Sequence, residues 1–122
     1  MQQAQYMLTV SHDNLQNGHY GTSVNRSYYA LFYAASALLL SVGQSRKSHY
    51  GLMSAFRQQF IKTEKWPVEF SDLYGDLIED REISDYAIFV LISQEDAQNN
   101  LENASRFVAQ AEKWLRDREE LP

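Results

Sequence analysis

Two arginines stand where a helical pattern otherwise places apolar side chains. Arg81 continues the apolar row that ends at Ile78, and Arg26 precedes Tyr29 by three residues on the most apolar segment of the chain. A buried guanidinium needs a partner, because leaving it unpaired is strongly destabilising. Asp85 follows Arg81 by four residues, the spacing at which a carboxylate on the same helical face can pair with it.

Further donors and acceptors come from three neighbouring side chains, those of Asn25, Tyr29 and Tyr86. We predict that segment 81–86 faces these residues of the apolar segment, together with Arg26, in one polar pocket. The alternative interpretation is a structural polar network that links two helices, which is the more common role for a pair of arginines.

His49 is the remaining candidate for chemistry, because it follows Arg46 and Lys47 at the start of a predicted helix. Two cations and the free N–H groups of a helix N-terminus favour an anion there. A solvated histidine is the alternative. His12 and His19 have no acid at ligand spacing and the chain has no cysteine, so we predict no metal site and no cofactor.

The elements that must position these residues are helices throughout. Apolar spacing and capping residues predict helices over 4–15, 24–42, 48–63, 67–78 and 93–115. Thr22 or Ser23 is expected to cap the second helix, Ser48 the third and Ser93 the last. The segment Tyr86 to Ile92 has strand-like composition but is too short to build a sheet alone. The sequence therefore predicts an all-α, up-and-down bundle of about five helices in a single domain, 1–122.

Composition agrees with one buried core. The chain has 122 residues, of which 44% are apolar and 13% aromatic. It has no apolar run that approaches the ~18 residues of a membrane span and no visible secretory signal, so no membrane association is expected. The lack of cysteine permits a reducing compartment, and the cytoplasm is the expected location.

The net charge of −5 is unevenly distributed. Residues 1–70 hold six basic and three acidic residues, a charge of +3, whereas residues 71–122 hold five and thirteen, a charge of −8. General affinity for duplex nucleic acid is therefore not expected, because such affinity needs many neutralised phosphates. A local positive pocket or a basic partner remains compatible with this charge.

The run NRSYYALFYAA at 25–35 resembles the NRxYYAxFxAA signature of HEPN-domain proteins, in their small stand-alone prokaryotic branch. Four further stretches follow in that family's order: SHYGL at 48–52, FIKT at 60–63, REISDY at 81–86 and ASRFV at 104–108. Five stretches in order are specific, although each one alone is weak.

The resemblance implies an up-and-down helical bundle that pairs as a homodimer. Relatives of this kind are commonly encoded beside a minimal nucleotidyltransferase, as a toxin–antitoxin pair. Many HEPN proteins are metal-independent ribonucleases whose motif is an arginine followed after four to six residues by a histidine. The arginine stabilises the phosphate in the transition state, and the histidine is an acid or base.

This sequence departs from that motif. Arg81 matches the arginine, but all three histidines precede it, and Asp85 and Tyr86 stand in the expected place, as in an RxxxDY variant. A carboxylate is a poor acid at neutral pH unless its pKa is raised. His49 can replace the missing histidine only if the fold or the dimer brings it near Arg81.

Three functions therefore compete. The first is a HEPN toxin that cleaves RNA, with Arg81, Asp85 and Tyr86 as catalytic candidates. The second is a nuclease-inactive HEPN protein that binds a nucleotidyltransferase partner, a nucleotide or single-stranded RNA through the same pocket. The third is a dimerising helical adaptor. The binding candidates shared by the first two functions are Asn25, Arg26, Tyr29 and His49.

The surplus of apolar residues predicts where two copies meet. Segment 86–92 follows Arg81 closely and is too apolar for a solvated loop. We expect it to pack either on its own bundle or across a two-fold axis, where isologous pairing would place two Arg81 pockets close together.

Overall fold

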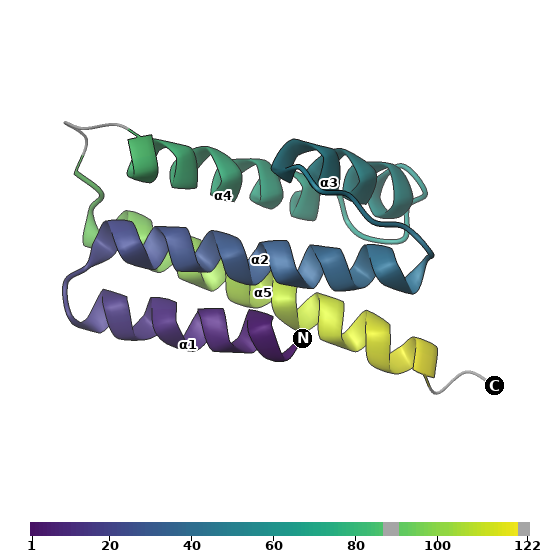
Figure 1. Cartoon of the computed structure of the whole chain (residues 1–122), viewed down its shortest axis with the longest axis horizontal. Coiled ribbons are helices and arrows are strands. Elements are labelled where there is room, and N and C mark those ends of the chain that lie inside the picture. The colour runs from purple at the N-terminus through teal and green to yellow at the C-terminus, as the bar shows by residue number, and fades with distance from the viewer. Residues whose placement is uncertain (87–90, 120–122) are drawn as a thin grey trace.

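The chain folds into a bundle of packed helices. The computed structural model describes residues 1–86 and 91–119. Over these residues it contains five α-helices and one short π-helical turn, which are α1 (Gln2–Gln16), α2 (Tyr20–Ser41), α3 (His49–Phe56), η1 (Arg57–Ile61), α4 (Glu69–Tyr86) and α5 (Gln94–Glu119). Figure 1 shows α1 on one side of α2, α3 and α4 on the other, and α5 crossing behind. The predicted all-α bundle of about five helices is confirmed.

The central element is α2. It packs against α1, α3, α4 and α5, and ten of its residues are buried. Tyr28, Leu31 and Leu38 on this helix have no exposed surface. A helix that is apolar on nearly every side has to be surrounded in this way. None of the helices in the described part of the chain has the length and apolar character needed to cross a membrane.

The prediction of a Thr22 or Ser23 cap is wrong. α2 begins at Tyr20, so its N-cap is His19, three residues before Thr22, and His19 makes no side-chain capping bond. The physical reason is the turn before it, in which Gly18 adopts a φ of +79° and the His19 N–H donates to the Asn14 carbonyl at 2.8 Å. Ser23 is buried instead, and its hydroxyl bonds to that of Ser11 on α1.

The other two predicted caps are confirmed. The Ser48 hydroxyl accepts a hydrogen bond from the Gly51 N–H at 2.9 Å, and α3 starts at the next residue, His49. The Ser93 hydroxyl accepts from the Asp96 N–H at 3.0 Å. Both serines satisfy one of the amides that a helix start leaves unpaired.

An aromatic core holds α3 and η1 onto the rest of the bundle. The Phe56 ring lies 5.2 Å from that of Phe107 on α5 and 5.5 Å from that of Tyr74 on α4, measured between ring centroids. Phe60 and Trp66 extend the cluster, and both are almost fully buried. This packing fixes the position of α3, and with it that of His49.

The fourth helix extends past its apolar row. That row reaches Ile78, and α4 continues to Tyr86, so Arg81 and Asp85 lie on one helix and one turn apart. The backbone of Tyr86 is helical, not strand-like. The rest of the predicted strand-like segment includes residues 87–90, which lie outside the described residues, so the interface predicted for it stays a prediction.

Candidate functional site

Arg81 is a buried cation on α4. Only 8% of the residue is exposed. Its guanidinium carbon lies 5.2 Å from the ring centroid of Tyr28 and 5.8 Å from that of Tyr29, both on α2. A guanidinium over aromatic faces is attracted by their π electrons, most strongly where water is excluded. Two tyrosines thus form the wall against which this arginine lies.

The Asp85 carboxylate joins Arg81 to α2. Its Oδ2 accepts a hydrogen bond from Arg81 Nε at 3.2 Å, and its two oxygens accept from Asn25 Nδ2 at 3.0 and 3.2 Å. Burial lowers the pKa of Arg81, but Tyr29 and Asp85 beside it more than offset this effect, so that the pKa is raised overall. The guanidinium is therefore always charged. Its two terminal nitrogens make no hydrogen bond with the described residues.

Helix α4 approaches α2 closely at this point. The Ser84 hydroxyl donates to the Gly21 carbonyl at 2.9 Å, and a Cβ on Gly21 would lie 3.1 Å from that hydroxyl. A side chain at Gly21 would therefore require a small shift of the Ser84 hydroxyl. Beside it lies a surface depression lined by Gly21, Thr22, Asn25, Arg26, Ser84 and Asp85.

His49 reaches the same two tyrosines from α3. Its Nδ1 lies 2.7 Å from the Tyr28 hydroxyl, and its ring packs 5.0 Å from that of Phe32 and 5.9 Å from that of Tyr29. Burial, followed by the positive charge of Arg81, lowers the pKa of His49. The fold therefore brings His49 to the residues on which Arg81 lies, although it comes from a different helix.

These contacts define a cluster of side chains that we call the Arg81 pocket, formed by Asn25, Tyr28, Tyr29, His49, Arg81 and Asp85. Arg26 is less involved than the sequence suggested. It is half-buried, lines the depression and forms no ion pair within the described residues. The Tyr86 side chain lies outside the described residues.

Sequence reasoning missed three residues at or near this pocket. Tyr28 was assigned to the apolar core, and it is fully buried, yet its hydroxyl holds His49. Tyr50 and Glu82 form a pair at the rim, in which the Tyr50 hydroxyl donates to Glu82 Oε1 at 2.6 Å, and this bond raises the pKa of Tyr50. For Tyr28 the sequence held one signal, because a tyrosine on a buried helical face usually needs a polar partner for its hydroxyl.

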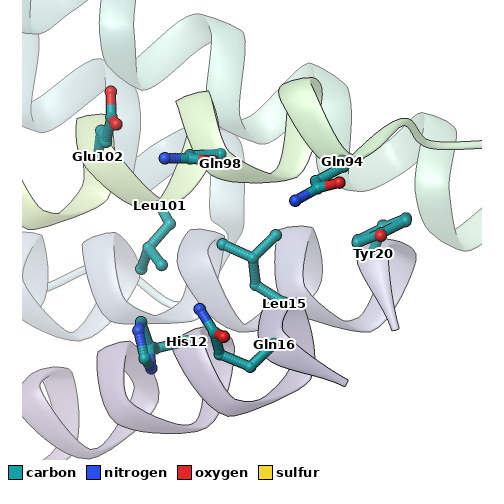
Figure 2. A pocket seen from close by; sticks show the side chains of 8 residues that line it. All are labelled: His12, Leu15, Gln16, Tyr20, Gln94, Gln98, Leu101 and Glu102. Carbon is teal, nitrogen blue, oxygen red and sulfur yellow. The ribbon is translucent and has the colours of Figure 1, made fainter. Parts of the chain in front are cut away.

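A second hollow lies elsewhere, between α1 and the first turns of α2 and α5. Figure 2 shows Leu15 and Leu101 pointing toward one another, with His12, Gln16, Tyr20, Gln94, Gln98 and Glu102 around them. Its lining has no arginine or lysine. An anion in this hollow would therefore lack the cationic partner that Arg81 provides in the Arg81 pocket. Across the described parts of the chain, no group of three His, Asp or Glu side chains is placed to hold a metal ion.

The fold and the pocket together define a class of protein: a small helical bundle whose central helix carries an Asn-Arg pair in its second turn and faces a buried arginine on a later helix. A model of the HEPN domain family matches residues 1–114. The chain belongs to the HEPN family, and the resemblance carried by 25–35 and the four later stretches is confirmed.

Three individual proteins are similar to this chain over most of its length. A UPF0332 protein of Thermotoga maritima is 38% identical over 103 residues, which cover 84% of this chain and 78% of that protein. A protein of Methanocaldococcus jannaschii that bears the name putative toxin is 30% identical over 115 residues, 94% of this chain and 78% of its own length. A UPF0332 protein of Gloeobacter violaceus is 37% identical over 97 residues, 79% of this chain and 77% of that protein.

Proposed function

We propose that this chain is the HEPN component of a toxin–antitoxin-like module and that it cleaves single-stranded RNA at the Arg81 pocket without a metal ion. The observation that carries the proposal is the state of Arg81, a buried guanidinium whose Nε is held by Asp85 and whose terminal nitrogens make no hydrogen bond with the described residues. Two relatives from Methanocaldococcus jannaschii that bear the name putative toxin support the biological context.

The chemistry assigned to the pocket is charge stabilisation. The ribose 2′-oxygen loses its proton to water and attacks the adjacent phosphorus, the bond from phosphorus to the 5′-oxygen breaks, and the products are a 2′,3′-cyclic phosphate and a 5′-hydroxyl that takes up a proton from water. Negative charge grows on the phosphoryl oxygens in this step, and a donor already in place at a water-poor site stabilises it strongly. Arg81 is the donor. Asp85 is a positioning residue, because it holds Arg81 on one side and Asn25 on the other. Tyr86 stays a catalytic candidate from the sequence.

The proposed partners follow from the family. They are a second copy of the chain, which would place two Arg81 pockets near one cleft, and a minimal nucleotidyltransferase that acts as the antitoxin. Because the proposed substrate is RNA, we propose that the protein acts in the cytoplasm.

A second function is favoured by a different observation. No histidine follows Arg81, and the carboxylate that takes its place is engaged by two donors, so it is not free to move a proton. A nuclease-inactive HEPN protein that binds RNA, a nucleotide or its nucleotidyltransferase through the same pocket would need no acid–base group. The experiment below separates the two functions.

The test uses a 5′-labelled single-stranded RNA, the purified protein and an excess of chelator. We expect cleavage to persist with the chelator and to fall by on the order of 10²–10³-fold in Arg81→Ala, the loss typical of a transition-state donor. Arg116→Ala is the matched control, because Arg116 is exposed on α5.

Three outcomes decide the question. Cleavage that the chelator abolishes, or that survives in Arg81→Ala, contradicts the mechanism. RNA that binds in an Arg81-dependent way but stays intact establishes the nuclease-inactive alternative. Equal loss in Arg116→Ala assigns the effect to general charge and not to the pocket.

A further inference from the structure

We propose that His49 donates a hydrogen bond through Nε2–H to the same phosphodiester that Arg81 binds, and that it does so as a neutral ring and not as the missing acid or base. The inference rests on the proposed function for the identity of its ligand. It makes the site bipartite, with one donor from α4 and one from α3.

His49 and Arg81 lie against the same pair of tyrosine rings. His49 and Arg81 both contact the rings of Tyr28 and Tyr29, His49 with centroid distances of 5.5 and 5.9 Å and Arg81 at 5.2 and 5.8 Å. The positive charge of Arg81 also acts on the His49 ring, and in the proposed site the two side chains lie on one side of this wall, where one phosphate group contacts both.

The Tyr28 hydroxyl decides which nitrogen of the His49 ring carries the hydrogen. Tyr28 has no exposed surface, and His49 Nδ1, at 2.7 Å, is its hydroxyl's only hydrogen-bond partner within the described residues. A buried hydroxyl proton left without an acceptor is costly, so the hydroxyl donates to Nδ1. Burial raises the pKa of Tyr28, which keeps the phenol protonated. With Nδ1 accepting, the neutral ring carries its hydrogen on Nε2, where it is a donor.

The surroundings of His49 favour its neutral form. The titratable groups around His49 are Tyr28 and Tyr29 from α2, Arg81 and Glu82 from α4, and Tyr50 from its own helix. Burial and Arg81 disfavour the imidazolium, and Glu82 opposes them, with a net lowering of the pKa of His49. A histidine held neutral near a cation can polarise a substrate oxygen as a hydrogen-bond donor. Nε2 makes no hydrogen bond with the described residues.

The groups around Arg81 and His49 favour a ligand that accepts hydrogen bonds. The two nearby carboxylates are already engaged, Asp85 by Arg81 and Asn25, and Glu82 by the Tyr50 hydroxyl. The N–H groups of Arg81 and His49 that are left for a ligand are the terminal guanidinium nitrogens and the imidazole Nε2–H, which are all donors. Oxygens of a phosphodiester are acceptors only, so they match this set.

The first test compares two replacements of His49. Glutamine places an amide N–H near the Nε2 position but cannot exchange protons at neutral pH, whereas alanine provides neither. The probe is the uncleavable deoxy dinucleotide thymidylyl-(3′,5′)-thymidine, with affinity measured by calorimetry. We expect His49→Ala to weaken binding by on the order of tenfold, as the loss of one hydrogen bond to a charged group does. His49→Gln should stay within about threefold of the native protein. His12→Ala, at an exposed histidine of α1, is the matched control.

The second test needs no substitution of His49. Nitrogen-15 NMR of the native protein at neutral pH should show Nδ1 unprotonated and Nε2 protonated, and Tyr28→Phe should weaken that preference. A ring with its hydrogen on Nδ1 overturns the proposal. So does His49→Gln binding as weakly as His49→Ala, or a native protein that does not bind the probe.

The same experiments separate this inference from the proposed function. If the probe binds through His49 and Arg81 but RNA is not cleaved, the nuclease proposal fails and the bipartite site stands. If RNA is cleaved as well by His49→Ala as by the native protein, the nuclease proposal stands and the role of His49 is disproved.

Discussion

At the scale of single residues, the pocket depends on one carboxylate that binds two donors. Asp85 accepts hydrogen bonds from the Arg81 guanidinium and from the Asn25 amide, and it thereby ties α4 to α2. Its own side chain is 27% exposed, whereas that of Arg81 is only 10% exposed. Removal of the carboxylate therefore leaves the more buried partner unpaired.

We predict that Asp85→Ala destabilises the protein by about 1–3 kcal/mol, the cost of a buried donor without its acceptor. Asp85→Asn should cost less, because an amide oxygen can still accept from Arg81. The midpoint of urea unfolding measures both, with Asp117→Ala, at an exposed position of α5, as the control. An unchanged midpoint in Asp85→Ala shows that the pair contributes nothing to stability.

His49 predicts a pH dependence with a definite sign. Its pKa in the folded protein lies below the ordinary value of 6.5. Between the two values the unfolded chain binds more protons than the folded one, so the free energy of unfolding rises with pH. The contribution of His49 is complete above pH 6.5 and is lost as the pH falls toward the folded pKa.

This linkage is checked by denaturant unfolding of the native protein and of His49→Gln at several pH values between 5 and 8. We expect the native protein to lose stability relative to His49→Gln as the pH falls below about 6.5. Parallel curves for the two proteins are the result that contradicts it.

At the scale of elements, the short helix α3 matters because it presents His49 in its first turn. Two features hold it, the Ser48 cap at its start and the aromatic contacts of Phe56 at its end. The cap is local, whereas the aromatic contacts reach α5. The position of His49 thus depends on both local and long-range interactions.

We predict that Ser48→Ala lowers the free energy of unfolding by about 0.5–2 kcal/mol, as the loss of a serine N-cap does. Ser48→Asp should restore it, since aspartate also caps well. Because the cap lies next to His49, the same substitution should also broaden or shift the His49 ring signals in NMR. Unchanged stability and unchanged His49 signals would show that the aromatic contacts alone hold α3.

At the scale of the whole molecule, α2 is central but not fully covered. Tyr29, Phe32 and Tyr33 are half-buried, and Leu40, two turns further along, is 66% exposed. An apolar stripe of this kind beside the Arg81 pocket is suited to contact with a second copy of the chain. The stripe lies within the described residues, unlike most of the segment 86–92 on which the sequence places the interface.

We predict a homodimer, with a mass in light scattering of twice the 14.2 kDa of one chain. Leu40→Glu should shift the species toward the monomer, because it places a charge in the apolar stripe, while circular dichroism stays unchanged. Tyr6→Glu is the control, since Tyr6 is 63% exposed on α1. A native protein that is monomeric at micromolar concentration ends the composite-cleft proposal.

The sequence by itself determined the helices, two of the three predicted caps and the presence of a buried arginine. These features depend on local spacing: an apolar row with helical period, a serine before it, and a cation on its apolar face are all visible within a few residues. The HEPN signature at 25–35 had the same local character, and it was sufficient to indicate the family.

Only the tertiary structure decided which polar residues meet. Arg26 and Arg81 look alike in sequence, yet Arg81 is buried against Tyr28 and Arg26 lies half-buried at a depression. The meeting of His49 with Tyr28, 21 residues earlier in the chain, depends on where the aromatic core places α3 over α2. Helical periodicity states which face of a helix is buried, but not which residue of another helix lies opposite, because that depends on packing between distant segments.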